Sequence, residues 1–210
     1  MVMSRAAEAQ PVAMRSTPGR VVIGSTIETV ARVRDAAGHT VFDVTFEERD
    51  DTGVVARTIT RVDGNTLLPV RQRAELGDGH VVTLHYLLNH VIGIDSASDH
   101  SASLFSTAVP DSIFSSGAID LLLRALPLGE RYRGSIPIYF PADNLIQSLP
   151  VRVMSQDRIT TRSGRSVACW LVAADFPGGI TEHFWIEQAT HTIVRILAHD
   201  SETSLVRYDR

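Results

Sequence analysis

DSIFSSGAIDLLLRAL, residues 111–126, is the stretch that decides the fold, because it is the one helix-like segment in a chain of strand-like segments. Asp111 or Ser112 can cap the free N–H groups of the first turn, and Pro127 prevents the helix from continuing. Apolar residues recur at steps of three and four, which predicts a helix over residues 111–126 with a broad apolar face. Such a face must be buried, and the flanking segments read as sheet that can wrap around it.

The flanking segments alternate between apolar and polar residues and are separated by tight turns, as strands of an antiparallel meander are. The strands predicted before the helix cover residues 21–33, 39–48, 54–62, 67–76, 81–87 and 91–94, and those after it cover 135–140, 145–157, 167–175, 180–187, 192–198 and 204–208. We expect a break in the strand 145–157 at Pro150, and we expect the Ser-rich residues 95–108 to form a crossover loop.

This pattern predicts an α+β fold that is mostly antiparallel β. We expect a curved sheet or half-barrel meander with one main helix packed on its concave face. We also expect one β-rich domain over residues 21–210, preceded at residues 1–20 by a disordered tail or the remnant of a signal peptide.

Composition excludes several classes of function. The net charge is −4 and the basic residues are scattered, so a nucleic acid is not an expected partner. All 20 basic residues are Arg, which leaves no lysine for a Schiff base or a general base. Cys169 is the single cysteine, which excludes an intramolecular disulfide and a thiolate-rich metal site. No run of eighteen apolar residues predicts a transmembrane helix.

The N-terminal residues bear on location. Residues 1–20 lack the apolar core of a signal peptide, but Ala7, Glu8 and Ala9 followed by Gln10 are typical of the end of one. Two interpretations stay open here, an exported protein and a cytosolic protein with a disordered tail.

Three short stretches carry a family resemblance. They are Val62-Asp63 with Leu67-Leu68-Pro69-Val70, Ala125-Leu126-Pro127-Leu128 after the apolar helix, and Phe184-Trp185-Ile186 followed by Thr190 and Val194-Arg195. In this order they resemble an exported bacterial β-rich family of unknown function. The resemblance implies a curved antiparallel sheet crossed by a helix, similar to the half-barrel of the lipoprotein carriers and receptors of the bacterial envelope, the LolA/LolB-like proteins.

The resemblance implies a non-enzymatic envelope protein in the periplasm or another exported location. It implies that the protein binds or transfers a hydrophobic ligand, a lipid or a lipidated partner, between sheet and helix, with an envelope protein as a further partner. It defines no catalytic residue, and we predict no cofactor. The residues expected to line the ligand site are Phe42, Phe46, Leu84, Tyr86, Ile119, Leu122, Leu123, Leu126 and Trp185.

Two alternatives from other classes stay open. A small hydrolase or isomerase would use His85, His90 or His183 with a carboxylate at the mouth of the barrel. A structural interaction module would pair an exposed, uncharged edge strand with an envelope complex.

Single side chains also carry expectations. No metal-ligand motif occurs, although His183 and His191 can approach across a hairpin. Cys169 reads as a packed apolar thiol. Trp170 and Trp185 lie in neighbouring predicted strands, where they can stack across the sheet, cover the core or its rim, or form a wall of a ligand cavity.

Overall fold

The computed structural model describes residues 12–16, 20–50, 53–76, 79–97, 99, 101–161, 163–199 and 204–208. The chain divides into two compact units. The first contains Ile27–Ile119 and Pro137–Gln147, and the second contains Asp120–Ile136 and the described parts of Ala7–Thr26 and Ser148–Arg210. The predicted N-terminal tail falls mostly on residues 1–11 and 17–19, which lie outside the described residues.

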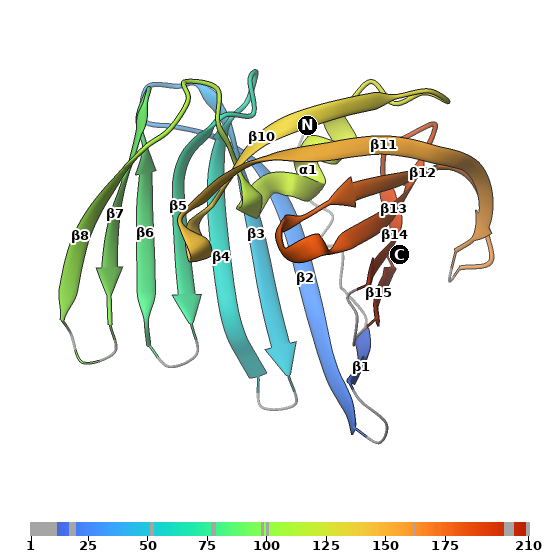
Figure 1. The fold of residues 1–210 in the computed structure, drawn as a ribbon, viewed down its shortest axis with the longest axis horizontal. Helices are drawn as coiled ribbons and strands as arrows, with labels where there is room; N and C mark the ends of the chain where they lie inside the picture. Colours follow the sequence, from blue (N-terminus) through green and yellow to red (C-terminus); the bar gives the residue numbers. More distant parts are fainter. Residues whose placement is uncertain are drawn as a thin grey trace. The chain divides into compact units, whose positions relative to one another are not determined.

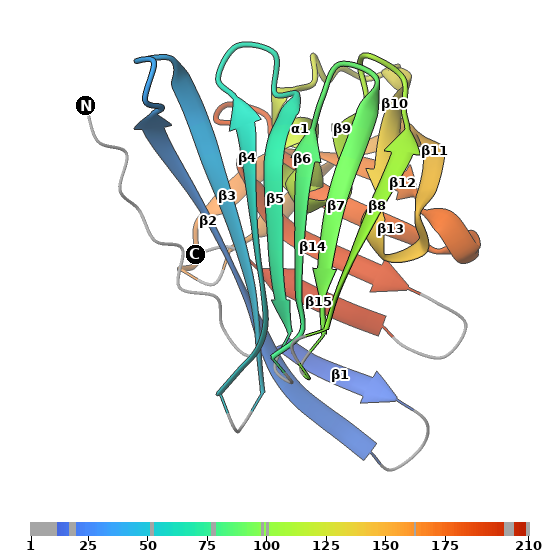
Figure 2. The same cartoon turned by 90° about the vertical axis from the view of Figure 1, so that its left-hand side faces the viewer.

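The first unit is built on an antiparallel meander, and the predicted α+β fold with a curved, mostly antiparallel sheet is confirmed (Figures 1 and 2). Its strands lie in the order β8-β7-β6-β5-β4-β3, so each one pairs with its neighbour in sequence. They are β3 (Thr40–Asp50), β4 (Gly53–Asp63), β5 (Pro69–Leu76), β6 (Val81–Tyr86), β7 (His90–Ser96) and β8 (Ala102–Ala108).

The register of this meander separates two faces. One row of directly opposed residues lies on the inner face, which is the buried one, and it consists of Val44, Thr60, Gln72, Leu84, Gly93 and Phe105. The neighbouring row lies on the outer face and consists of Thr45, Ile59, Arg73, Thr83, Ile94 and Leu104. The alternation between apolar and charged residues in the sequence therefore reports the two faces of the sheet.

The second unit is another antiparallel meander, in the strand order β15-β14-β13-β12-β11. Its core contains Val167, Cys169, Trp185 and Val194. The strands are β11 (Leu145–Thr160), β12 (Ser166–Asp175), β13 (Thr181–Glu187), β14 (Ile193–His199) and β15 (Ser204–Tyr208), and β1 (Val12–Ser16) pairs with both β15 and β2 (Arg20–Arg34). Strands β2, β11 and β10 (Arg133–Phe140) contribute residues to both units.

The helix is shorter than predicted. Helix α1 covers only Ile119–Ala125, and before it come β9 (Phe114–Ser115) and the 3₁₀ turn η1 (Ser116–Ala118). The chain stays extended at Phe114 because β9 pairs in parallel with β10, and the Ser115 hydroxyl then caps η1 by accepting from the Gly117 N–H at 3.2 Å. The C-terminal end agrees with the prediction, since α1 stops two residues before Pro127.

Two further predictions were wrong. Residues 102–108 are not a loop, because they form β8, which pairs with β7 along its whole length. Strand β11 also runs through Pro150 without a break. Proline is tolerated there because pairing with β12 begins only at Val151, one residue later.

A polar cluster fixes η1 on the inner face of the first unit. The buried Gln72 Oε1 accepts from the Ser115 hydroxyl at 2.6 Å and from the Tyr86 hydroxyl at 3.2 Å. Gly117 lies against Thr60, where a Cβ on the glycine would come within 2.3 Å of the Thr60 hydroxyl. Only glycine therefore allows this close approach.

Candidate functional site

The residues predicted to line a ligand site are divided between the two compact units. Leu84 is 1% exposed and packs, with the half-buried Tyr86, among Val91, Val109 and Tyr139 in the core of the first unit. Trp185 belongs to the core of the second unit. Of the others, Ile119, Leu122 and Leu123 are buried, and Phe42, Phe46 and Leu126 are half-buried. Their role in binding a ligand stays a prediction.

Three described histidines of the first unit lie at different places along β6 and β7, since His80 precedes β6, His85 lies on β6 and His90 begins β7. His85 is exposed and lies opposite Arg71, and His90 shares a hydrogen bond of 2.7 Å with the Asn89 side chain. His80 contacts the Asp95 carboxylate, and His39 Nδ1 lies 3.4 Å from the Asp35 carboxylate. The described residues contain no group of three or more side chains suited to holding a metal ion.

The side chains singled out in the second unit have structural surroundings. His183 lies opposite Leu197, so the register does not bring it to His191. His191 lies in the turn between β13 and β14, where its Nδ1 is 2.8 Å from the Arg124 carbonyl oxygen. Trp170 lies opposite Ile186, and Trp185 lies opposite Leu171, so the two tryptophans are on opposite faces of the sheet and do not stack. Trp185 instead donates to Asp157 at 2.9 Å, and the Arg195 guanidinium lies 4.5 Å from its ring centre.

Cys169 has the surroundings of an inert thiol. It is fully buried, and burial together with the nearby Glu187 and Asp157 carboxylates raises its pKa to about 11. A thiol held in its neutral form is a poor nucleophile, which agrees with the apolar role expected from the sequence.

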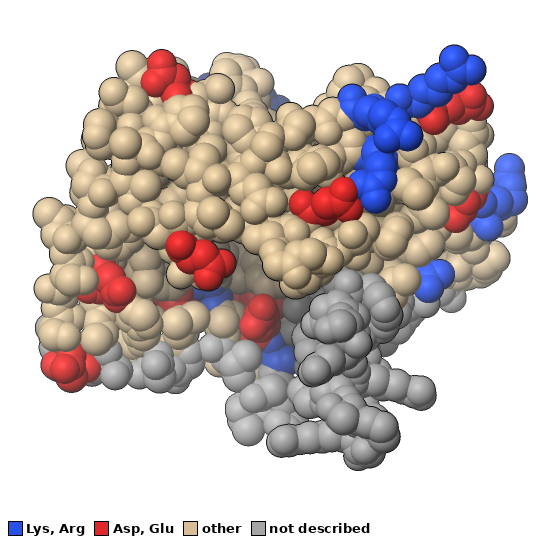
Figure 3. All heavy atoms as spheres, viewed as in Figure 1, with Lys and Arg blue, Asp and Glu red and all other residues tan. Residues whose placement is uncertain are grey.

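Strand β8 is an open edge of the curved sheet. Among the described residues it pairs only with β7, and it stands at the end of the strand order (Figure 1). Residues 101–110 carry no charged side chain, and uncharged atoms cover most of this region in Figure 3. The register with β7 is continuous, so no bulge blunts the edge. Natural proteins normally protect an edge strand with charges, prolines or bulges, and β8 has none of these between its ends.

The hydrogen-bond pattern shows which groups of β8 face outward. The N–H of Ala97 donates to the Ser101 carbonyl oxygen, and the N–H of Val109 donates to the Asn89 carbonyl oxygen. The pairs Ala97–Ser101 and Asn89–Val109, which flank the β7–β8 ladder at its two ends, are therefore hydrogen-bonded pairs. Such pairs alternate along antiparallel strands. The N–H and C=O groups that point away from β7 therefore belong to Ala102, Leu104, Ser106 and Ala108.

Exposed apolar side chains lie on β7, on β8 and in the turn between β6 and β7. Leu104 is 75% exposed and lies opposite Ile94, which is 42% exposed. Leu87 and Leu88, in the turn between β6 and β7, are 54% and 75% exposed. Clustered exposed apolar residues mark sites of interaction more often than single ones do.

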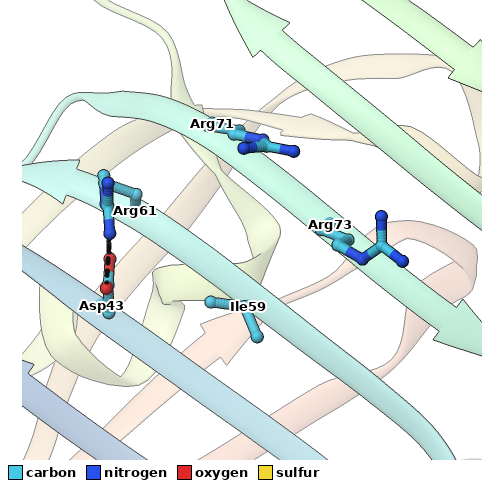
Figure 4. A pocket seen from close by; sticks show the side chains of 5 residues that line it. All are labelled: Asp43, Ile59, Arg61, Arg71 and Arg73. Carbon is cyan, nitrogen blue, oxygen red and sulfur yellow. Dashed lines mark hydrogen bonds and ion pairs between the residues drawn. The ribbon is translucent and has the colours of Figure 1, made fainter.

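A second feature of the outer face is a shallow hollow of about 160 Å³ lined by Asp43, Ile59, Arg61, Arg71 and Arg73, which we name the arginine hollow (Figure 4). Arg61 binds the Asp43 carboxylate through two hydrogen bonds of 2.7 and 2.8 Å, and this contact raises the pKa of the guanidinium. From the sequence, these arginines are only part of a scattered set of basic residues. The spacing of Arg71 and Arg73 on one strand face was the signal available.

Comparisons with known proteins agree with this fold. Residues 11–204 match the model of the DUF3108 family, which is described as a protein of unknown function. The chain is also similar to a crystal structure described as a beta-barrel-like protein of domain of unknown function DUF1849 from Brucella abortus. The TM-score is 0.58 at 10% sequence identity, over 98% of this chain and 97% of that chain, so the likeness concerns the fold alone. No curated protein matches the chain.

Proposed function

The chain belongs to the DUF3108 family of unknown function, and we propose that it is a non-enzymatic interaction module that adds an extended strand of a partner protein to its sheet at β8. The observation that carries this proposal is the uncharged, unblunted edge of β8, with the outward N–H and C=O groups of four residues. Strand addition at such an edge is a recurring way of recognising peptides.

The chemistry of the edge selects the partner. The outward main-chain groups need donors and acceptors, which another polypeptide offers and an acyl chain does not. On the outer face, Ala102, Ser106 and Ala108 are small and Leu104 is apolar and exposed. An uncharged segment with bulky apolar side chains on that face would pack beside the small residues and cover Leu104. The partner is therefore an extended, uncharged, apolar segment of a protein.

A labelled synthetic peptide in which valine and serine alternate, VSVSVSVSV, is uncharged and has one apolar face, and it provides a model strand for the test. The wild-type protein is expected to bind it saturably in fluorescence anisotropy. Ser106→Pro removes one outward N–H without removing a hydrogen bond to β7, and it should weaken binding about fivefold or more, as the loss of a hydrogen bond of about 1 kcal/mol predicts. Ser106→Ala retains the N–H and is the matched control.

Leu104→Arg supplies an independent variant, because it places a charge on the edge by changing a side chain that is 75% exposed. It should lower peptide affinity while the circular dichroism of the protein stays unchanged. Equal affinity in wild type, Ser106→Pro and Leu104→Arg would refute strand addition, as would the absence of saturable binding to the wild type. Self-association of the wild type that both variants abolish would instead identify a second copy of this chain as the occupant, and would overturn the proposal of a separate partner.

A second candidate function is the binding of a hydrophobic ligand, a lipid or a lipidated protein, as the resemblance to the lipoprotein carriers implies. The specific observation in its favour is the exposure of Leu87 and Leu88, at 54% and 75%, in one turn. Apolar area that leaves water would drive such binding at about 25 cal/mol per Å². The proposed location is the periplasm or another exported compartment.

Native mass spectrometry of protein purified without detergent tests this second function. A co-purifying mass that extracts into organic solvent, and that Leu88→Glu removes from a protein that still folds, would establish a hydrophobic ligand. A clean protein mass under the same conditions would count against it.

A further inference from the structure

We propose that the arginine hollow binds a phosphate group, with Arg71 as its principal contact. The proposal concerns the outer face of strands β4 and β5, away from the edge strand β8, and does not depend on strand addition.

The charges across the sheet carry this inference. Asp43, Arg61, Arg71 and His85 lie directly opposite one another on β3, β4, β5 and β6. Two arginines therefore face each other across β4 and β5, an arrangement that destabilises a sheet unless an anion compensates it. Asp43 compensates Arg61, at 2.7 and 2.8 Å. The other neighbour of Arg71 in this row is the exposed His85, which supplies no negative charge.

The neighbouring arginine also has a carboxylate partner of its own. Arg73 Nε donates to Glu75 Oε1 at 2.7 Å. Within the described part of the chain, Arg71 makes no ion pair of 4.0 Å or less with a carboxylate, whereas Arg61 and Arg73 both do. The hollow is therefore lined by three arginines, and among the described residues no carboxylate compensates the charge of Arg71.

The size and shape of the hollow suit a small oxyanion. Its volume of about 160 Å³ has room for about five water molecules, or for a phosphate with part of its hydration shell. Arg71 and Arg73 extend from the same strand in Figure 4, and Ile59 forms an apolar part of the lining of the hollow. Guanidinium groups bind phosphate oxygens through paired N–H donors, which gives geometry as well as charge. Phosphate is thus the chemical class that this site fits.

The phosphate can come from a free anion or from the headgroup of an anionic lipid, and two probes separate these sources. The first is inorganic phosphate, titrated at constant ionic strength and followed by ³¹P NMR and by the melting temperature. The second is flotation with vesicles of phosphatidylcholine containing phosphatidylglycerol, compared with vesicles of phosphatidylcholine alone.

Arg71→Gln and Arg57→Gln form a matched pair for both probes. Arg57 also lies on the outer face of β4, but it faces the Glu47 carboxylate at 3.4 Å, so its removal takes away the same charge outside the hollow. Arg71→Gln is expected to weaken phosphate or vesicle binding about fivefold or more, and Arg57→Gln less than about twofold. Phosphate should raise the melting temperature of the wild type and of Arg57→Gln, but not that of Arg71→Gln.

The outcomes decide the proposal. Binding of inorganic phosphate that depends on Arg71 supports a site for the free anion, and vesicle binding that depends on both phosphatidylglycerol and Arg71 supports a headgroup site. Equal losses in Arg71→Gln and Arg57→Gln would show unspecific attraction and overturn the site. Absence of binding by the folded wild type to both probes would overturn it as well.

Discussion

Thr60 places a hydroxyl group on the buried inner face of the sheet, where most side chains are apolar. Its side chain is fully buried, and its hydroxyl has no hydrogen-bond partner among the described residues. A buried polar group without a partner costs about 1–3 kcal/mol of stability. The neighbouring Gly117 allows η1 to approach this hydroxyl closely. The unpartnered hydroxyl therefore lies at the place where η1 packs on β4.

Replacement of this hydroxyl should therefore stabilise the protein. We expect Thr60→Val to raise the free energy of unfolding by about 1 kcal/mol, because a methyl group replaces an unpartnered hydroxyl. Thr160→Val, on an exposed position of β11, should change it by less than about 0.5 kcal/mol. Urea denaturation measures both values. Destabilisation by Thr60→Val would indicate that the hydroxyl has a partner, such as a buried water.

Glu187 makes the stability of the second unit depend on pH. Its carboxylate accepts from both terminal nitrogens of Arg165, at 2.8 and 3.2 Å, and from the Thr190 hydroxyl at 2.8 Å. These contacts hold the pKa of Glu187 below its ordinary value. The carboxylate therefore contributes stability above the pKa of the unfolded chain, and this contribution is lost as the pH falls through the lower, folded pKa.

Glu187→Gln should remove part of this acid sensitivity. At pH 7 the variant should lose about 1 kcal/mol of stability, since Arg165 is largely exposed and the pair is screened by solvent. Between pH 5 and 3 the stability of the variant should fall less steeply than that of the wild type. Glu48→Gln, at an exposed position, is the control for loss of a carboxylate. Parallel stability–pH curves for wild type and Glu187→Gln would contradict this role.

At the scale of elements, β8 shows why pairing can override a weak local pattern. Its sequence, ASLFSTA, is rich in Ser and Ala, which favour strands weakly, and its Leu and Phe are adjacent rather than alternating. The strand forms because β7 supplies a full ladder and because Phe105 packs directly over Gly93. A Cβ at Gly93 would come within 2.0 Å of the Phe105 ring.

Gly93→Ala should accordingly loosen β8. The methyl group would displace the Phe105 ring, and we expect a loss of about 1–3 kcal/mol of stability together with faster amide exchange in residues 102–108. Gly129→Ala is the matched control, because a Cβ there meets nothing within 4 Å. Unchanged exchange in β8 of Gly93→Ala would show that the Phe105 ring does not hold the edge strand in place.

At the start of the helix, a local pattern that fits a helix was overridden by pairing with a distant strand. The spacing of apolar residues through Ile113 and Phe114 fits a helix. Phe114 is nevertheless in a strand, because it pairs with Ile138 of β10, 24 residues later in the chain. A long-range partner of this kind leaves no mark in the local sequence. The end of α1 was predictable because Pro127 acts locally on the preceding turn.

At the scale of the whole molecule, alternation of apolar and polar residues was sufficient to predict most strands and the mostly antiparallel class. It did not predict whether an apolar side chain fills a core or lines a ligand site, because both roles give the same apolar pattern in the sequence. Leu84 and Leu123 are buried, and their sequence pattern is compatible with either role. The arginine hollow was also missed. Arg61 and Arg71 become neighbours only through the register of β4 and β5, which residue spacing alone does not fix.

The two compact units each have a core of their own, and the described residues contain no helix long and apolar enough to cross a membrane. Both features proposed to bind partners, the β8 edge and the arginine hollow, belong to the first unit. The proposed interactions can therefore be tested by variants within one sheet.

Amide hydrogen exchange of β8, followed by NMR, tests strand addition most directly. In the free protein, the outward N–H groups of Leu104, Ser106 and Ala108 should exchange much faster than the inward ones of Ser103, Phe105 and Thr107, and the peptide of alternating valine and serine should slow the outward set selectively. Equal protection of both sets in the free protein would show that the edge is already covered, and would contradict the proposed function.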